Sequence, residues 1–278
     1  MTDNEISNTA ESGTRLFARF LSVQKAFQQR EGEVHGTGEI ARAAGLDDST
    51  TSRILKAGAA AGFFERMGRG KYRLGLGAVH LGMQALAHVP VMDSATHAVL
   101  EKLREATDGG LVFQYMVAPF GGAQRQCCDM AVGDSDLVEL GMTALDILSV
   151  TRSLRTGASG RTILAHLPRA LQDIVLAEPV PEEAGPGVYR DTEELRLSLE
   201  EVRSLGYALG YEECMPYWNS CAAPIFWDQS IMGAVLLLKP ATVMPKAPPA
   251  VIEATRAAAS QLSARVSHKL SHLPEPIG

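Results

Sequence analysis

Apolar residues recur at helical spacing near the start of the chain and predict three helices. Residues 14–30 place Leu16, Phe20, Val23 and Phe27 on one stripe, which is typical of a helix with one buried face. Gly36-Thr37 opens a second, short helix, and Gly45 ends it in the left-handed conformation that glycine adopts readily.

A third helix is predicted directly after that glycine turn. Asp47-Asp48-Ser49 supplies residues that start helices, and Ile54, Leu55 and Gly58 face inward until Gly62 ends the pattern. Two short helices joined by a tight turn that contains glycine form a helix-turn-helix. Residues 64–67 and 71–74 then flank Gly68-Arg69-Gly70, which indicates a hairpin, the wing of a winged helix-turn-helix.

The rest of the chain mixes helix-like and strand-like segments. A domain of long helices and antiparallel strands belongs to the α+β class. Helices are predicted at residues 76–87, 92–107, 191–205 and 250–270, and strands at 111–117, 123–131, 207–213, 221–227 and 231–239. The segment 177–190 is rich in proline and glycine and is expected to be a loop.

These patterns divide the chain of 278 residues into two domains and their connections. Residues 1–13 are polar and acidic, without the apolar core of a signal peptide, and are expected to form a disordered tail. Residues 14–75 are expected to form the winged helix-turn-helix, 76–91 a linker helix, and 92–272 a ligand-binding domain.

Charge changes this picture because it is distributed unevenly. The net charge is −6, yet residues 14–80 carry 11 Lys and Arg against 6 Asp and Glu. From residue 81 onward the balance reverses, with 15 basic against 23 acidic residues. Positive charge confined to one end suggests a nucleic-acid-binding module attached to a different domain.

The candidate DNA contacts lie on the third helix and the hairpin. A recognition helix enters the major groove while basic residues of a wing follow the phosphate backbone. The alternative is a small helical domain whose basic hairpin is only solvated. The candidate DNA-binding residues are Ser49, Thr50, Ser52, Arg53, Arg66, Arg69, Lys71 and Arg73.

Three segments together resemble the isocitrate lyase regulator (IclR) family of transcription regulators. Residues 39–82 show its helix, Gly-Leu turn, Ser-Thr-x-x-Arg and Arg-Tyr-x-Leu-Gly run. GASGRTILAHLP resembles its Gly-Lys-Ala-x-Leu-Ala helix, and GYALGYEECMPYWNSCAAPIF its Gly-Tyr…Glu-Glu…Ala-Ala-Pro-Ile segment. The resemblance runs from about residue 14 to about residue 270. It implies a GAF-like sensor fold, an effector pocket at the start of the GASGRT helix, and a dimer.

The chain departs from the family pattern at five positions. Arg161 stands where the family usually has lysine, Ser220 where it has cysteine, and Gly210 where it often has aspartate. Leu236 and Leu238 replace small hydroxyl side chains that hold a small polar acid in some members. These changes argue against a glyoxylate-like or pyruvate-like ligand and favour an effector with an apolar or aromatic body.

The glycine-rich start of the helix at residue 157 is the candidate effector site. Free amides and the positive end of the helix dipole attract an anion such as a carboxylate. The alternative is that the glycines serve close packing alone. The candidate effector-binding residues are Met130, Ala158, Ser159, Gly160, Ser220, Cys221, Leu236 and Leu238.

Catalytic chemistry finds no support in the sequence. The segment from Gly157 to Thr162 lacks the spacing of a phosphate-binding loop and of a nucleophile elbow. The four cysteines form no CxxC and have no histidine at metal-ligand spacing. We therefore expect no catalytic residues, no metal and no cofactor, and a reduced, cytoplasmic chain without a membrane span.

The leading hypothesis is a regulator that binds double-stranded operator DNA under the control of a small organic acid. The expected role is that of a repressor, although the sequence leaves activation open. The chain is expected to act with itself, as a dimer or a dimer of dimers. The alternative hypothesis is a sensor or enzyme whose helix-turn-helix mediates protein contacts.

Overall fold

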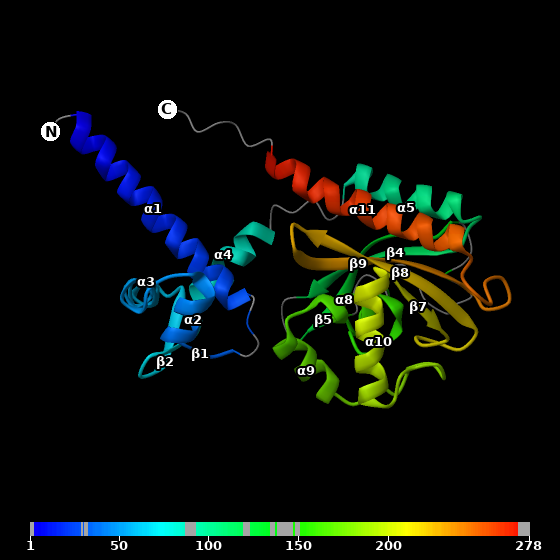
Figure 1. The fold of residues 1–278 in the computed structure, drawn as a ribbon. Coiled ribbons are helices and arrows are strands. Elements are labelled where there is room, and N and C mark those ends of the chain that lie inside the picture. Colours follow the sequence, from blue (N-terminus) through cyan, green and yellow to red (C-terminus); the bar gives the residue numbers. More distant parts are fainter. Residues whose placement is uncertain are drawn as a thin grey trace. The chain divides into compact units, whose positions relative to one another are not determined.

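The computed structural model describes residues 3–28, 30, 33–86, 93–118, 123–133, 137, 147 and 151–271. Two compact units make up the chain (Figure 1). Unit 1 consists of Met1–Val89 with Pro168–Ala170, and unit 2 of Pro90–Leu167 and Leu171–Gly278. The division after Val89 falls within the linker that the sequence predicts at residues 76–91.

Unit 1 is a winged helix-turn-helix, as expected. A three-stranded sheet of order β1-β3-β2 carries the hairpin, and Val23, Ile40, Leu55, Phe64 and Tyr72 meet in the core between helices and sheet. The elements are α1 (Asp3–Gln28), β1 (His35–Gly36), α2 (Thr37–Ala44), α3 (Asp48–Ala60), β2 (Phe64–Gly68), β3 (Lys71–Leu74) and α4 (Leu76–Leu86).

Local chemistry explains the turn between α2 and α3. Gly45 ends α2 with φ of 65°, a left-handed conformation that suits glycine. Asp47 begins α3, and its carboxylate accepts a hydrogen bond from the Thr50 amide at 2.8 Å. A Cβ at Gly58 would collide with the ring of Phe64, so glycine lets the hairpin pack closely on α3.

The start of the chain differs from the prediction. Residues 1–13 were expected to be a disordered tail, but α1 begins at Asp3. A helix satisfies its own backbone hydrogen bonds, so the polar segment can extend the helix that residues 14–28 form without any apolar stripe of its own. Leu16, expected to be buried, is exposed.

Unit 2 has the α+β architecture that the sequence predicts. Its six-stranded antiparallel sheet has the order β6-β5-β4-β9-β8-β7. The strands are β4 (Leu111–Ala118), β5 (Gln124–Ala131), β6 (Thr151–Ser153), β7 (Ala208–Tyr211), β8 (Trp218–Trp227) and β9 (Ser230–Pro240). The helices are α5 (Ser94–Ala106), α8 (Gly157–His166), α9 (Arg169–Ala177), α10 (Thr192–Leu205) and α11 (Pro249–Ser271).

Helices cover both faces of this sheet (Figure 1). Helices α5 and α11 lie side by side on one face, and α8 packs on the other against β7, β8 and β9, with α10 beside it. Side chains alternate along each strand, so Leu236 and Leu238 of β9 join the core on the α8 side. Val235 and Leu237 join the core on the α11 side.

Within the described residues, no helix is long and apolar enough to cross a membrane.

Candidate functional site

Helix α3 presents polar side chains on the face opposite its buried residues. Ile54 and Leu55 are buried in the core of unit 1. Ser49 and Arg53 are exposed and Ser52 is half-buried, as the sequence predicts for a recognition helix. Lys56 is also exposed and lies one turn beyond Arg53, so it extends this face. Sequence reasoning left Lys56 out, although its spacing from Arg53 was a sufficient signal.

Thr50 does not belong to that face. It was expected to be exposed, but it is buried beside the fully buried Thr51. The two threonines precede Ile54 and Leu55 by one turn, and side chains four residues apart share a face. Thr50 instead contributes its backbone amide, which donates a hydrogen bond to the Asp47 carboxylate. This hydrogen bond is the main reason that the pKa of Asp47 lies well below its usual range.

The hairpin carries the second group of cations. Arg66, Arg69 and Lys71 are exposed, as expected. The Arg66 Nε donates to the Gly68 carbonyl at 3.1 Å, which holds the base of its guanidinium near the tip of the wing. Arg73 is different because it forms an ion pair with Glu65 at 2.8 Å. Its charge is therefore partly neutralised within the hairpin.

The predicted effector residues of α8 lie at the start of that helix, inside unit 2. Ala158 and Ser159 are each only 1% exposed, and Gly160 is also buried. Thr156, which precedes the helix, makes no side-chain hydrogen bond to the free amides of its first turn. The Ser159 hydroxyl is buried without a hydrogen-bond partner. The first turn of α8 therefore has backbone amides and a serine hydroxyl that are buried and have no hydrogen-bond acceptor among the described residues.

Gly210 brings Ser220 to the same helix start. A Cβ at residue 210 would lie 2.5 Å from the Ser220 Oγ and 3.2 Å from the Ala158 amide nitrogen. The hydroxyl and the amide thus border one point, which glycine leaves open. The Ser220 hydroxyl donates its proton to the Gly210 carbonyl at 3.4 Å, so in this orientation it can only accept further hydrogen bonds.

The apolar side chains predicted for the effector site lie in the core on the same face of the sheet as α8. Leu236 and Leu238 belong to the same core cluster as Ala158, and Met130 packs against that cluster. Met130 reaches this face because β5 contains a bulge opposite Gln114 and Tyr115, where the pairing skips Cys128. Without the bulge, strand alternation would direct Met130 and Cys127 to opposite faces.

Cys221 is not part of this group. It was expected to line the effector site, but it alternates with Ser220 and points to the other face of the sheet, where its thiol contacts Thr255 of α11. Burial raises the pKa of the Cys221 thiol to about 11, which leaves it protonated at neutral pH. Its role is packing.

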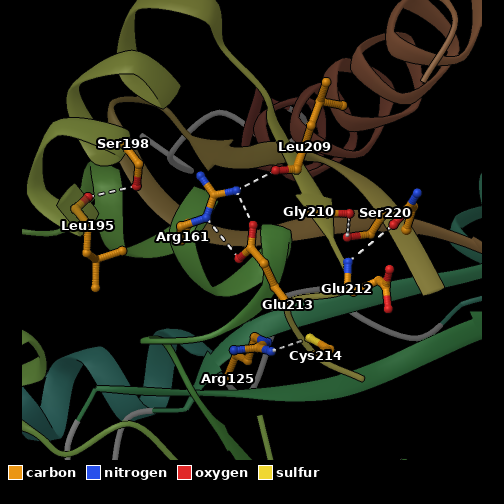
Figure 2. A network of polar contacts seen from close by, with 11 residues as sticks. Arg125, Arg161, Leu195, Ser198, Leu209, Gly210, Glu212, Glu213, Cys214 and Ser220 are labelled. Atoms are coloured by element: carbon orange, nitrogen blue, oxygen red, sulfur yellow. Dashed lines mark hydrogen bonds and ion pairs between the residues drawn. The ribbon is translucent and has the colours of Figure 1, made fainter. Parts of the chain in front are cut away.

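A buried ion pair fixes α8 to the loop after β7 (Figure 2). The Arg161 guanidinium donates to both carboxylate oxygens of Glu213, at 3.0 and 2.6 Å, and to the carbonyl of Leu209. Burial is the largest single influence and lowers the pKa of Arg161, but the charge and the hydrogen bonds of Glu213, with smaller contributions from Tyr189 and Glu201, together raise that pKa above its ordinary value. Arginine at this position therefore forms a bidentate pair that lysine could not make.

Metal chemistry gains no support from the part of the chain that the structure describes. No cluster of three or more His, Cys, Asp or Glu side chains there could hold a metal ion. All four cysteines are free.

Comparison with known proteins matches part of the second unit to a family model. Residues 150–264 match the family model described as "Bacterial transcriptional regulator IclR C-terminal". No curated protein sequence matches the chain.

Solved structures resemble the chain over nearly its whole length. An IclR-type transcriptional regulator from Silicibacter sp. TM1040 is 26% identical, with 91% of this chain and 96% of that one covered and a TM-score of 0.55. The IclR of Thermotoga maritima is 20% identical, with 95% and 100% covered and a TM-score of 0.54. An IclR homologue from Microbacterium hydrocarbonoxydans, complexed with 4-hydroxybenzoate, is 21% identical, with 91% and 99% covered and a TM-score of 0.55.

Proposed function

We propose that this chain, whose residues 150–264 match the IclR family model, is a repressor of that family of bacterial transcriptional regulators and that a small organic acid controls its binding to operator DNA. The family consists of regulators rather than enzymes, and we propose no catalytic activity and no cofactor. DNA binding is assigned to unit 1 and effector binding to unit 2.

The observation that carries the DNA-binding proposal is the exposed polar face of unit 1. Arg53 and Lys56 project from α3, while Arg66, Arg69 and Lys71 project from the hairpin. A helix in the major groove reads base edges, and cations beside it neutralise phosphates and release counterions. A solvated basic hairpin would not require cations and hydroxyls to align along the exposed side of the second helix of the motif.

Salt dependence of binding tests this proposal. The purified chain is titrated onto a fluorescent duplex from upstream of its own gene, at several salt concentrations, with a scrambled duplex of equal length as the control. The logarithm of affinity is expected to fall linearly with the logarithm of salt concentration, by about 0.9 per neutralised phosphate. Binding that is equal for the two duplexes, or absent from both, contradicts operator recognition.

The proposed effector is a carboxylic acid with an apolar or aromatic body. Its carboxylate would accept hydrogen bonds from the amides of Ala158 and Ser159, and from the Ser220 hydroxyl once this turns away from the Gly210 carbonyl. Leu236 and Leu238 would contact the body, and leucines leave each buried hydroxyl of a polar ligand unmatched, at about 1–3 kcal/mol each. The Microbacterium homologue, which has the same fold, binds 4-hydroxybenzoate, and this supports the proposed class.

Calorimetry distinguishes the two classes of acid. We expect measurable binding of benzoate or 4-hydroxybenzoate and much weaker binding of glyoxylate and pyruvate. A matched variant, Leu236→Thr, restores a hydroxyl of the kind that some family members have, and should shift the preference toward the small acids. Tight glyoxylate binding with no aromatic acid bound would show that the leucine argument is wrong.

Self-association and location complete the proposal. Unit 1 exposes large apolar side chains on two helices, which suits pairing with a second copy. These are Leu16, Phe17 and Leu21 on α1 and Leu76, Val79 and Leu81 on α4. We propose a cytoplasmic dimer or dimer of dimers, and light scattering of the variant with Leu76 and Leu81 changed to Ser tests it.

A further inference from the structure

Unit 2 buries three arginines near α8, and two of them have a negative partner. Arg161 is paired with the carboxylate of Glu213. Arg155 donates to the carbonyls of Leu176 and Arg190, the first of which lies in the last turn of α9, the negative end of that helix. In each case, a full or partial negative charge compensates the buried guanidinium.

Arg125 is buried with weaker compensation, which consists of one loop carbonyl, one sulfur and one aromatic ring. It is 1% exposed, and its guanidinium donates to the Ser153 carbonyl and approaches the Cys214 sulfur at 3.9 Å (Figure 2). The guanidinium carbon lies 5.3 Å from the centre of the Tyr115 ring, and Nε, like that of Arg155, has no hydrogen-bond partner among the described residues. Within the described ranges, no carboxylate lies at ion-pair distance from Arg125.

The position of this charge makes its isolation more costly. A Cβ at Gly160 would lie 2.5 Å from the Arg125 Nη1, and one at Gly157 would lie 3.5 Å from Nη2. The guanidinium therefore lies against the first turn of α8, which is the positive end of that helix. The same turn holds the buried Ser159 hydroxyl, which also lacks a partner. The guanidinium and the positive end of α8 thus lie in contact, and an anion beside them would stabilise both.

We propose that Arg125 is the counter-ion of the effector's carboxylate, which binds beside the guanidinium at the first turn of α8. This inference rests on the proposed function and assigns the side chain that makes the charge of the carboxylate essential. The planar fork of arginine matches the two oxygens of a carboxylate, and the amides of the helix start donate to the same carboxylate. A neutral ligand of the same shape leaves the Arg125 charge unpaired and is rejected.

Thermal unfolding of the full chain tests the proposal with matched probes and variants. The probes are benzoate, 4-hydroxybenzoate, phenylacetate and hexanoate, with benzamide as the neutral counterpart of benzoate, in a low-salt buffer. The variants are Arg125→Met, which removes the charge, and Arg125→Lys, which keeps it without the fork. The control is Arg155→Met, which removes a buried arginine that already has partners.

At least one carboxylate should raise the melting temperature of the wild type, and benzamide should not. Arg125→Met should bind that carboxylate about 10–100-fold more weakly, the range expected for a lost hydrogen bond to a charged group. Without ligand, Arg125→Met should melt at or above the wild-type temperature, because a buried charge without a carboxylate partner is gone. Arg125→Lys should keep part of the preference for benzoate over benzamide. Arg155→Met should melt lower in every buffer and bind the carboxylate with unchanged affinity.

Three results would overturn the proposal. These are a lower melting temperature of unliganded Arg125→Met with unchanged carboxylate affinity, equal binding of benzoate and benzamide, or no response of the wild type to any carboxylate of the set. DNA titration of the same preparations separates this failure from that of the proposed function. A wild type that binds its upstream duplex specifically while failing these tests loses only the assignment of Arg125.

Discussion

Arginines are used in opposite ways in the two units. In unit 1, Arg53, Arg66 and Arg69 are exposed, and their charge is available to a partner outside the protein. In unit 2, Arg125, Arg155 and Arg161 are buried, and their charge acts within the fold. Exposed cations are screened by salt and suit a long polyanion, whereas a buried cation acts over a few ångströms and suits a single small anion.

This contrast would allow an acidic protein to bind DNA, as we propose. The excess of negative charge lies in the part of the chain that forms unit 2, so the net charge says little about either site. What matters is the local field of each unit. The net charge of the whole chain argues against DNA binding, whereas the charge of residues 14–80 alone predicts it.

The largest effect is expected from breaking the ion pair of unit 2. Glu213→Gln should lower the free energy of unfolding by about 3–5 kcal/mol, because it leaves the Arg161 charge buried and unpaired. Urea unfolding followed by tryptophan fluorescence measures this, since both tryptophans, Trp218 and Trp227, lie in β8 of unit 2. The control is Glu200→Gln on the exposed side of α10, which should change little. Equal effects of the two substitutions on the free energy of unfolding would show that the buried ion pair contributes no more to stability than an exposed carboxylate does.

A smaller effect is expected at the recognition helix of unit 1. Arg53→Ala should weaken operator binding by about 1–3 kcal/mol and relax specificity at one base pair, without changing the unfolding of unit 2. Fluorescence anisotropy with single-base variants of the operator measures both effects. Lys246→Ala, which removes an exposed cation from unit 2, is the matched control. Unchanged operator affinity in Arg53→Ala would remove this residue from the interface.

The smallest effect per residue is expected at the wing. Replacing Arg69 and Lys71 with Ala should weaken binding to operator and scrambled DNA by the same factor. The slope of log affinity against log salt should become shallower by about one unit per lost phosphate contact. If only operator binding suffers, these side chains read bases rather than phosphates.

The sequence predicted the elements of both units well because their signals are local. Gly45 and Asp47 bound the turn of the helix-turn-helix, and Asp191 and Gly206 bound α10 by the same chemistry. Helix α9 and strand β6 escaped prediction; both are short, and isolated helices as short as α9 are stabilised chiefly by tertiary contacts. Polar residues 3–13 give no apolar pattern, so their helix was missed as well.

The candidate site could be predicted only where backbone alternation decides the face. Leu236 and Leu238 lie on the face of the sheet that packs against α8, as expected. Cys221 was wrongly expected on the same face as its neighbour Ser220. Arg125 was not predicted as a site residue because an arginine in a strand is usually exposed. Its burial becomes visible only when β5, α8 and the loop after β7 come together.

We propose that an anion held in unit 2 controls DNA binding by unit 1. The most direct measurement is the affinity of the chain for its upstream duplex, with and without a carboxylate that raises its melting temperature, for the wild type and for Arg125→Met. We expect the carboxylate to change the affinity of the wild type for DNA several-fold, as coupling free energies of about 1–3 kcal/mol imply, and to leave that of Arg125→Met unchanged. A carboxylate that binds the wild type tightly but leaves its affinity for DNA unaltered would show that the two sites are not coupled.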